Sequence, residues 1–132
     1  MDVQVLRLSP GEDLRGVLAG ALAQRQEKAA CVLSAVGSFS RAVLRYAGED
    51  QATVLAGPLE LVALSGTISL DGPHLHASVS DAQGHVKGGH LMPGCIVRTT
   101  AEVVLGMLPQ WEFRRELDPA TGYLELLARR SG

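Results

Sequence analysis

The sequence lacks the features that define several large classes of protein. Aromatic residues make up only 4% of its 132 residues, so the core must be built mainly from Leu, Val, Ala and Ile. No apolar run approaches the length that crosses a bilayer, and no basic segment followed by an apolar one opens the chain. The only two cysteines, Cys31 and Cys95, lie far apart in apolar surroundings, which is typical of buried small side chains rather than of a disulfide. We therefore expect a cytoplasmic protein with no membrane segment.

Clustered positive charge is missing as well. The formal net charge is −2, and no Lys or Arg run is longer than the pairs Arg114-Arg115 and Arg129-Arg130. Proteins that bind nucleic acids draw much of their affinity from neutralising phosphates, which requires a basic surface. The composition therefore disfavours a DNA-binding protein that acts alone.

What is present indicates one compact domain over residues 1–132 with an α+β fold. The content of 46% hydrophobic and 20% charged residues is that of an ordinary globular protein. Ser9 and Glu12 form a capping-box pattern, and apolar residues from Leu14 to Leu22 recur at helical spacing. This pattern predicts one long N-terminal helix that begins at Ser9 and fades in residues 24–28.

The rest of the chain reads as short strands separated by turn residues. Apolar or alternating stretches predict strands at residues 1–8, 30–36, 42–46, 59–64, 67–70, 74–80, 95–108, 111–117 and 123–127. Residues 101–108 would also fit a second short helix. The close spacing of the strands favours hairpins, and hence a mostly antiparallel β-sheet.

Three of the four histidines fall in one stretch of strands and turns. His74 and His76 are two residues apart, so a strand places both on one face, with Leu75 and its apolar neighbours packing on the other. The chain between His76 and His90 is long enough to turn at residues 81–84 and return on an adjacent antiparallel strand. His85 belongs to that turn and is expected to be solvated.

Neutral imidazole is the commonest side-chain ligand of metals, and three histidines with an open fourth position are typical of catalytic zinc sites. One such histidine alone would be typical of a solvated strand residue. The set of three instead predicts a site for zinc or another divalent metal at His74, His76 and His90. Two carboxylates that interrupt apolar runs, Glu60 and Glu102, are candidates for proton transfer or for orienting a ligand histidine.

The order of motifs resembles the plant and prokaryote conserved (PPC) domain family. The matching segments are residues 35–38, 59–68, 75–80, 88–91, 100–104 and 114–122, and the most specific is Gly88-Gly89-His90-Leu91 after a strand histidine. The resemblance implies a compact α+β domain that forms a homotrimer. It also implies that His74, His76 and His90 hold zinc near the subunit interface. Plant relatives carry an additional Arg-Gly-Arg-Pro segment that grips the DNA minor groove, and this sequence has no such segment.

These observations leave two classes of biochemical function open, besides a purely structural role in which the trimer is a scaffold. One is a trimeric metal-binding protein that takes a small-molecule ligand, with metal-assisted hydrolysis or lyase chemistry as its activity. The other is a DNA-associated regulatory or assembly module in which the metal is structural. The sequence names neither a substrate nor a nucleophile, so whether the protein is an enzyme stays open.

Overall fold

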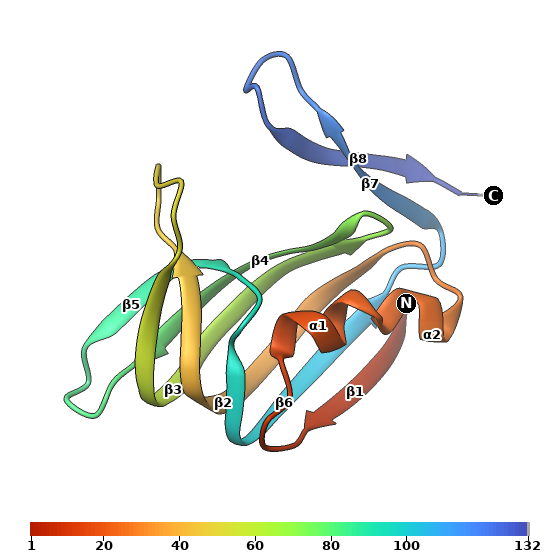
Figure 1. Ribbon diagram of the computed structural model, residues 1–132. Helices are drawn as coiled ribbons and strands as arrows, with labels where there is room; N and C mark the ends of the chain where they lie inside the picture. Colours follow the sequence, from red (N-terminus) through yellow and green to blue (C-terminus); the bar gives the residue numbers. More distant parts are fainter. Residues whose placement is uncertain (132) are drawn as a thin grey trace.

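A computed structural model describes residues 1–131 as two antiparallel β-sheets and two short helices (Figure 1). The strands are β1 (Asp2–Leu8), β2 (Ala30–Arg45), β3 (Thr53–Ser69), β4 (Gly72–Ser80), β5 (Val86–Leu91), β6 (Ile96–Met107), β7 (Trp111–Leu117) and β8 (Leu124–Arg130). The helices are α1 (Leu14–Ala19) and α2 (Ala21–Arg25). The predicted fold class, α+β with a mostly antiparallel sheet, is confirmed.

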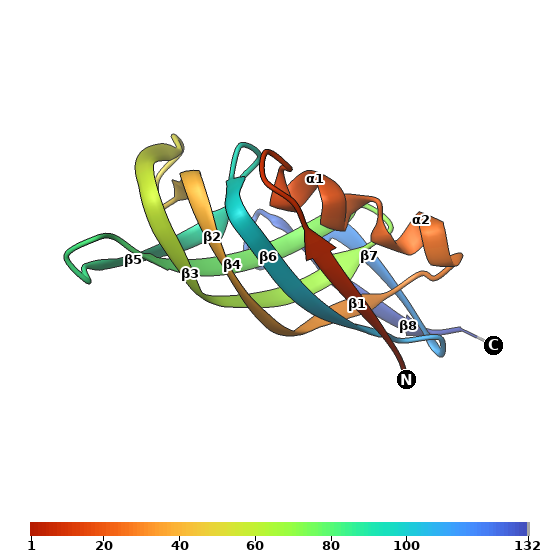
Figure 2. The ribbon, with the colours of Figure 1, turned by 90° about the horizontal axis from the view of Figure 1, so that it is seen from below.

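The large sheet curls until one edge meets its interior. Its strand order is β1-β6-β2-β3-β4-β5, and β5 also pairs with the end of β2 through Leu44 with Leu91 and Arg45 with His90. Figure 2 shows the resulting curvature, with both helices beside β1 and β6. Helix α1 contacts β4 and β6, so it covers the inner face of the sheet.

The core is aliphatic, as the shortage of aromatic residues predicts. Its largest fully buried side chains are Phe39, Leu8, Leu14, Leu18, Leu44, Leu61, Ile68, Leu105, Met107, Val79, Val97 and Val103. They come from α1 and from the strands of the large sheet, which explains why alternate strand positions are apolar.

The prediction of one long N-terminal helix is wrong. Gly11 has φ +88, which a right-handed helix does not allow, so residues 9–12 form a turn closed by the bond from Glu12 N–H to the Ser9 carbonyl oxygen (3.3 Å). The Glu12 carboxylate still accepts from Ser9 N–H at 2.8 Å, as a capping box requires. Helix α1 starts later, with Asp13 as its N-cap, and Gly20 separates it from α2. Neither helix has the length and hydropathy needed to span a membrane.

Four of the predicted strands form two pairs, and in the structure each pair is joined into one long strand. Gly37 does not end the strand that starts at Ala30. It lies inside β2, where this strand passes so close to β6 that a Cβ atom on Gly37 would be 2.7 Å from the Ala101 Cα atom. Strand β3 likewise runs through Ser65 and Gly66. Bulges in β2 and β3 bend these strands without breaking them. Residues 101–107 are strand, since β6 pairs with β1 on one side and β2 on the other.

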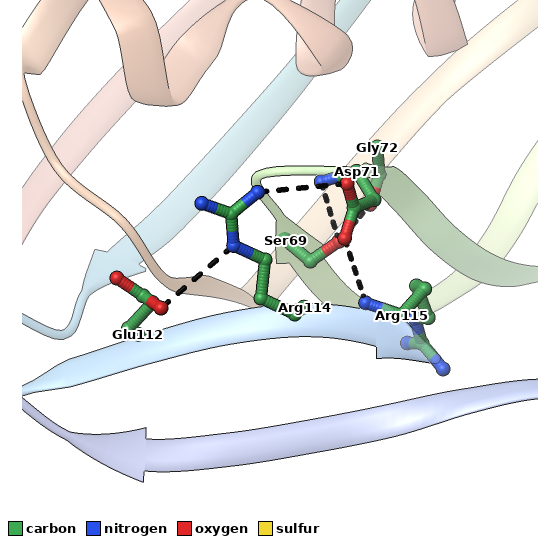
Figure 3. A network of polar contacts seen from close by, with 6 residues as sticks. All are labelled: Ser69, Asp71, Gly72, Glu112, Arg114 and Arg115. Carbon is green, nitrogen blue, oxygen red and sulfur yellow. Dashed lines mark hydrogen bonds and ion pairs between the residues drawn. The ribbon is translucent and has the colours of Figure 1, made fainter. Parts of the chain in front are cut away.

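Strands β7 and β8 form a separate hairpin that is fastened to the turn between β3 and β4. The carboxylate of Asp71 accepts from Arg115 N–H at 2.9 Å and lies 3.7 Å from the Arg114 guanidinium (Figure 3). Leu70 N–H also donates to the Phe113 carbonyl oxygen at 3.0 Å. These contacts fix the hairpin beside the start of β4.

Candidate metal centre

Strand β4 presents two of the three histidines on one face. Leu75 is 2% exposed and packs in the core, while His74 and His76 on either side of it point to the opposite face. The neighbouring strand β3 approaches closely here. A Cβ atom on Gly66, whose φ is +141, would overlap the carbonyl oxygen of His74. The sequence prediction of a shared histidine face is therefore reproduced.

Strand β5 brings the third histidine back to the first two. In the β4–β5 hairpin His90 is paired directly with His76. The preceding residue, Gly89, makes this possible, because a Cβ atom there would lie 2.6 Å from the carbonyl oxygen of Arg45 on β2. Only glycine lets β5 pass this close to β2. Gly89, directly before His90, is thus a packing requirement of the site.

The three imidazoles form a compact cluster. Ring centroids are 5.4 Å apart for His74 and His76, 5.1 Å for His74 and His90, and 4.6 Å for His76 and His90. One nitrogen from each ring lies within 4.8 Å of those of the other two. Nitrogens that share a tetrahedral zinc ion at about 2.1 Å lie about 3.4 Å apart. Modest rotations of the rings would therefore bring the three nitrogens to a single ion.

The surroundings favour the neutral form of two of the rings. Partial burial lowers the pKa of His74, and repulsion from Arg115, His90 and His76 lowers it further, against an opposing effect of Glu125. Burial likewise lowers the pKa of His90, helped by His76 and Arg45. A metal ligand must be the neutral imidazole, so both rings are held in the form that binds metal at neutral pH.

The histidines line a broad cavity of about 960 Å³. Its walls come from the β2–β3 turn, the β3–β4 turn, the β5–β6 connection and the C-terminal hairpin. The polar side chains among the lining residues, besides the histidines, are Arg15, Arg45, Tyr46, Glu49, Asp50, Asp71, Arg115, Tyr123 and Glu125. A small molecule at this cavity would meet the histidines and charged groups of both signs.

Neither predicted carboxylate lies beside the histidines in this chain. Glu60 is paired with Ser80, four residues along β4 from His76, or roughly 13 Å at the usual strand rise. Glu102 is an exposed residue on β6, three strands from β4 and thus roughly 14 Å away at the usual strand spacing. Neither lines the cavity. Their catalytic role stays a prediction, and the cavity itself does not support it.

The carboxylate that does act on the cluster is Glu125, whose charge partly opposes the lowering of the pKa of His74 and of Arg115 that burial causes. Glu125, Arg115 and Tyr46 were missed by the sequence analysis. Each comes from a segment far from the histidines in sequence, and no local spacing marks them. In the sequence, Arg114-Arg115 stands out only as two adjacent positive charges.

The fold and the histidine cavity define a small β-sheet domain with a candidate metal centre. The chain belongs to the Plants and Prokaryotes Conserved (PCC) domain family, whose model matches residues 1–109. The family that the motifs resemble is thereby confirmed.

Similar proteins differ in what surrounds the domain. Over 126 residues the chain is 50% identical to the bifunctional protein GlmU of Synechococcus sp. (strain JA-2-3B'a(2-13)), a match that covers 96% of this chain and 20% of that protein. The chain thus spans about a fifth of the length of that protein and of the GlmU protein from a second Synechococcus strain, JA-3-3Ab.

Solved structures match nearly end to end. A hypothetical protein from Salmonella cholerae-suis is 43% identical, with a TM-score of 0.94 over 98% of this chain and 94% of that one. A metal-containing protein from Archaeoglobus fulgidus is 30% identical, with a TM-score of 0.83 over 96% of this chain and 94% of that one.

Replacing Gly89 with alanine should damage the centre more than the same change at Gly88. The new methyl group at Gly89 would meet backbone at 2.6 Å, whereas at Gly88 the nearest atom is 3.1 Å away. We expect Gly89→Ala to lower the free energy of unfolding by about 1–3 kcal/mol, the usual cost of overpacking. Urea denaturation of both variants measures the free energy of unfolding. Equal decreases in the two variants would contradict the requirement for glycine at position 89, where β5 approaches β2.

The stability of the metal-free protein should fall as the pH drops below the ordinary histidine pKa of about 6.5. Folding lowers the pKa values of His74 and His90, so below that pH the unfolded chain binds more protons and is favoured. Thermal unfolding at pH 7.5 and 5.5 should show a larger loss in the wild type than in the His74→Gln/His90→Gln variant. His85→Gln, which changes an exposed histidine, serves as the control. Equal losses in the wild type and the double variant would refute the explanation.

Proposed function

We propose that this chain is a metal-binding domain in which His74, His76 and His90 together hold one divalent ion, with zinc the preferred metal. The observation that carries the proposal is the meeting of three ligand nitrogens within 4.8 Å, from two strands that pair at His76 and His90. Imidazole nitrogen suits zinc better than it suits magnesium or calcium, which prefer oxygen ligands. The metal-containing relative from Archaeoglobus fulgidus supports the same conclusion.

The donor set fits such an ion. Three neutral imidazoles leave at least one coordination position open, and the cavity of about 960 Å³ gives that position access to a small molecule. A bound ion would supply Lewis acidity, either toward a substrate oxygen or toward a water molecule. Hydrolysis or lyase chemistry on a small molecule is the activity most consistent with this arrangement.

The alternative function, a DNA-associated module with a structural metal, has less support. The sequence has 12 Lys and Arg residues against 14 Asp and Glu residues. It therefore offers little of the positive surface that phosphate binding requires.

We also propose that the domain assembles as a homotrimer. The outer face of the β1–β6–β2 part of the sheet, opposite the helices, carries exposed Val3, Val5 and Val36. Register places them on one face, since Val3 is paired with Gly106, Val5 with Val104, and Val36 with Glu102. An apolar sheet face of this kind is typical of a subunit interface. A closed assembly of a few copies would cover this apolar face, and the family resemblance suggests that the number of copies is three.

Metal analysis tests the histidine centre. Protein purified without chelator should carry close to one zinc or other divalent ion per chain. His76→Ala and His90→Ala should lose most of it, because each removes one of three ligands. His85→Ala is the matched control, since His85 lies on the exposed turn between β4 and β5 with 76% of its side chain accessible.

Elemental analysis by mass spectrometry gives the stoichiometry for all four proteins. Circular dichroism checks that the variants remain folded. Equal metal content in the wild type and in both site variants, or none in any, would remove the basis of the proposed function.

Light scattering after gel filtration tests the assembly. The wild type should elute with three times the 13.9 kDa mass of one chain. Val36→Lys should shift the protein toward monomer, because burying an unpaired charge in an apolar interface is costly. Val86→Lys places the same charge on an exposed position of β5, at the opposite edge of the sheet from β1, and should leave the mass unchanged. A monomeric wild type would end the trimer proposal.

A further inference from the structure

The cavity beside the histidines contains the guanidinium group of Arg115, which forms no ion pair within 4.0 Å in residues 1–131, although the charge of Glu125 acts on it. Nη2 of Arg115 donates to the Thr67 hydroxyl at 3.0 Å, and Thr67 is paired with His74 across β3 and β4. Its Nε atom is buried with no hydrogen-bond partner in residues 1–131. The ion pairs formed within the described chain leave out Arg115, although its neighbour Arg114 takes part in two.

Two further side chains on the cavity wall also lack a polar partner within residues 1–131. Arg45, whose charge lowers the pKa of His90, is likewise left out of the ion pairs of residues 1–131. The hydroxyl of Tyr46 is buried and has no hydrogen-bond partner in that part of the chain. An unpaired buried polar group is unfavourable, and such groups beside a cavity point to a polar ligand.

Of the four carboxylates that line the cavity, Glu125 is the one whose charge acts on the histidines. Asp71 is occupied by Arg114 at 3.7 Å and by the backbone N–H of Arg115 at 2.9 Å. Glu49 and Asp50 lie on the exposed turn between β2 and β3. A divalent ion held by three neutral histidines would add two positive charges next to Arg45 and Arg115, where Glu125 is the carboxylate that acts on the histidines.

We propose that the cavity binds a small molecule carrying an oxyanion, either a carboxylate or a phosphate group, and that Arg115 holds this group beside the histidine centre. This inference rests on the proposed metal site, because the metal contributes part of the charge that the anion neutralises. The planar guanidinium presents paired N–H donors that match the oxygens of carboxylates and phosphates. Its backbone N–H donates to Asp71 and its Nη2 donates to Thr67, so the guanidinium group is held in place before a ligand arrives.

Arg115 also has a structural contact, the bond to Thr67, and the experiment must separate the two roles. Arg115→Gln removes the charge. Arg115→Lys keeps the charge but loses the paired donors, so it should recover anion binding only in part. Arg129→Gln is the matched control, because it removes the same charge from an exposed position on the same hairpin, away from the cavity.

Cobalt(II) is the probe for the centre, since its visible spectrum reports on its ligands. The full chain is stripped of metal and loaded with cobalt. Sodium phosphate, sodium acetate or neutral acetamide is then added to each variant. We expect a saturable spectral change with at least one of the two anions and none with acetamide. Arg115→Gln should raise the Kd of that anion about tenfold or more, as loss of a charge-assisted contact does. Arg129→Gln should leave it unchanged.

The outcomes distinguish this proposal from the one on which it rests. A tighter response to phosphate or to acetate identifies which oxyanion the site prefers, and either result supports the proposal. Bound cobalt that ignores both anions, or an equal Kd in the wild type and Arg115→Gln, overturns the anion site and leaves the metal site intact. Failure of the wild type to bind cobalt overturns the metal site and the anion site together.

Discussion

The candidate site depends on one constraint, the close pairing of the last residues of β5 with the end of β2. Strand β5 pairs with β4 through most of its length and with β2 at its last two residues, His90 and Leu91. The pairing needs a residue without a side chain at Gly89, next to the Arg45 carbonyl oxygen. Because this pairing also sets the register of His90 against His76, the same contact shapes the fold and the histidine cluster. A shift by one residue would turn His90 to the other face.

What the sequence predicts correctly is local. Alternation along β4 places His74 and His76 together, and the turn at residues 81–84 predicts the return of His90, because both inferences use only spacing within one hairpin. The helix was predicted too early and too long, since the positive φ of Gly11 overrides the capping pattern. The continuity of β2 through Gly37 was missed because it depends on Ala101, a residue distant in sequence.

The same limit explains which parts of the site were missed. Arg115 and Glu125 reach the cavity only because Asp71, on the turn between β3 and β4, anchors the C-terminal hairpin. Nothing in the spacing of these residues indicates the contact. The hairpin also lies beyond residues 1–109, the part matched by the family model. The histidines therefore belong to the segment that defines the family, whereas part of the charge around them comes from outside it.

This division of the site has a consequence for its chemistry. At the proposed metal site, three neutral imidazoles would bring no negative charge to a divalent ion, so the ligand in the open position would determine how far the charge of the ion is balanced. Glu60 and Glu102 lie too far along and across the sheet to balance that charge within one chain. Arg115 and Arg45 increase the positive charge, and Glu125 offsets only part of it. At the proposed metal site an anionic ligand would therefore bind more tightly than a neutral one of the same size, because it would attract both the ion and the arginines.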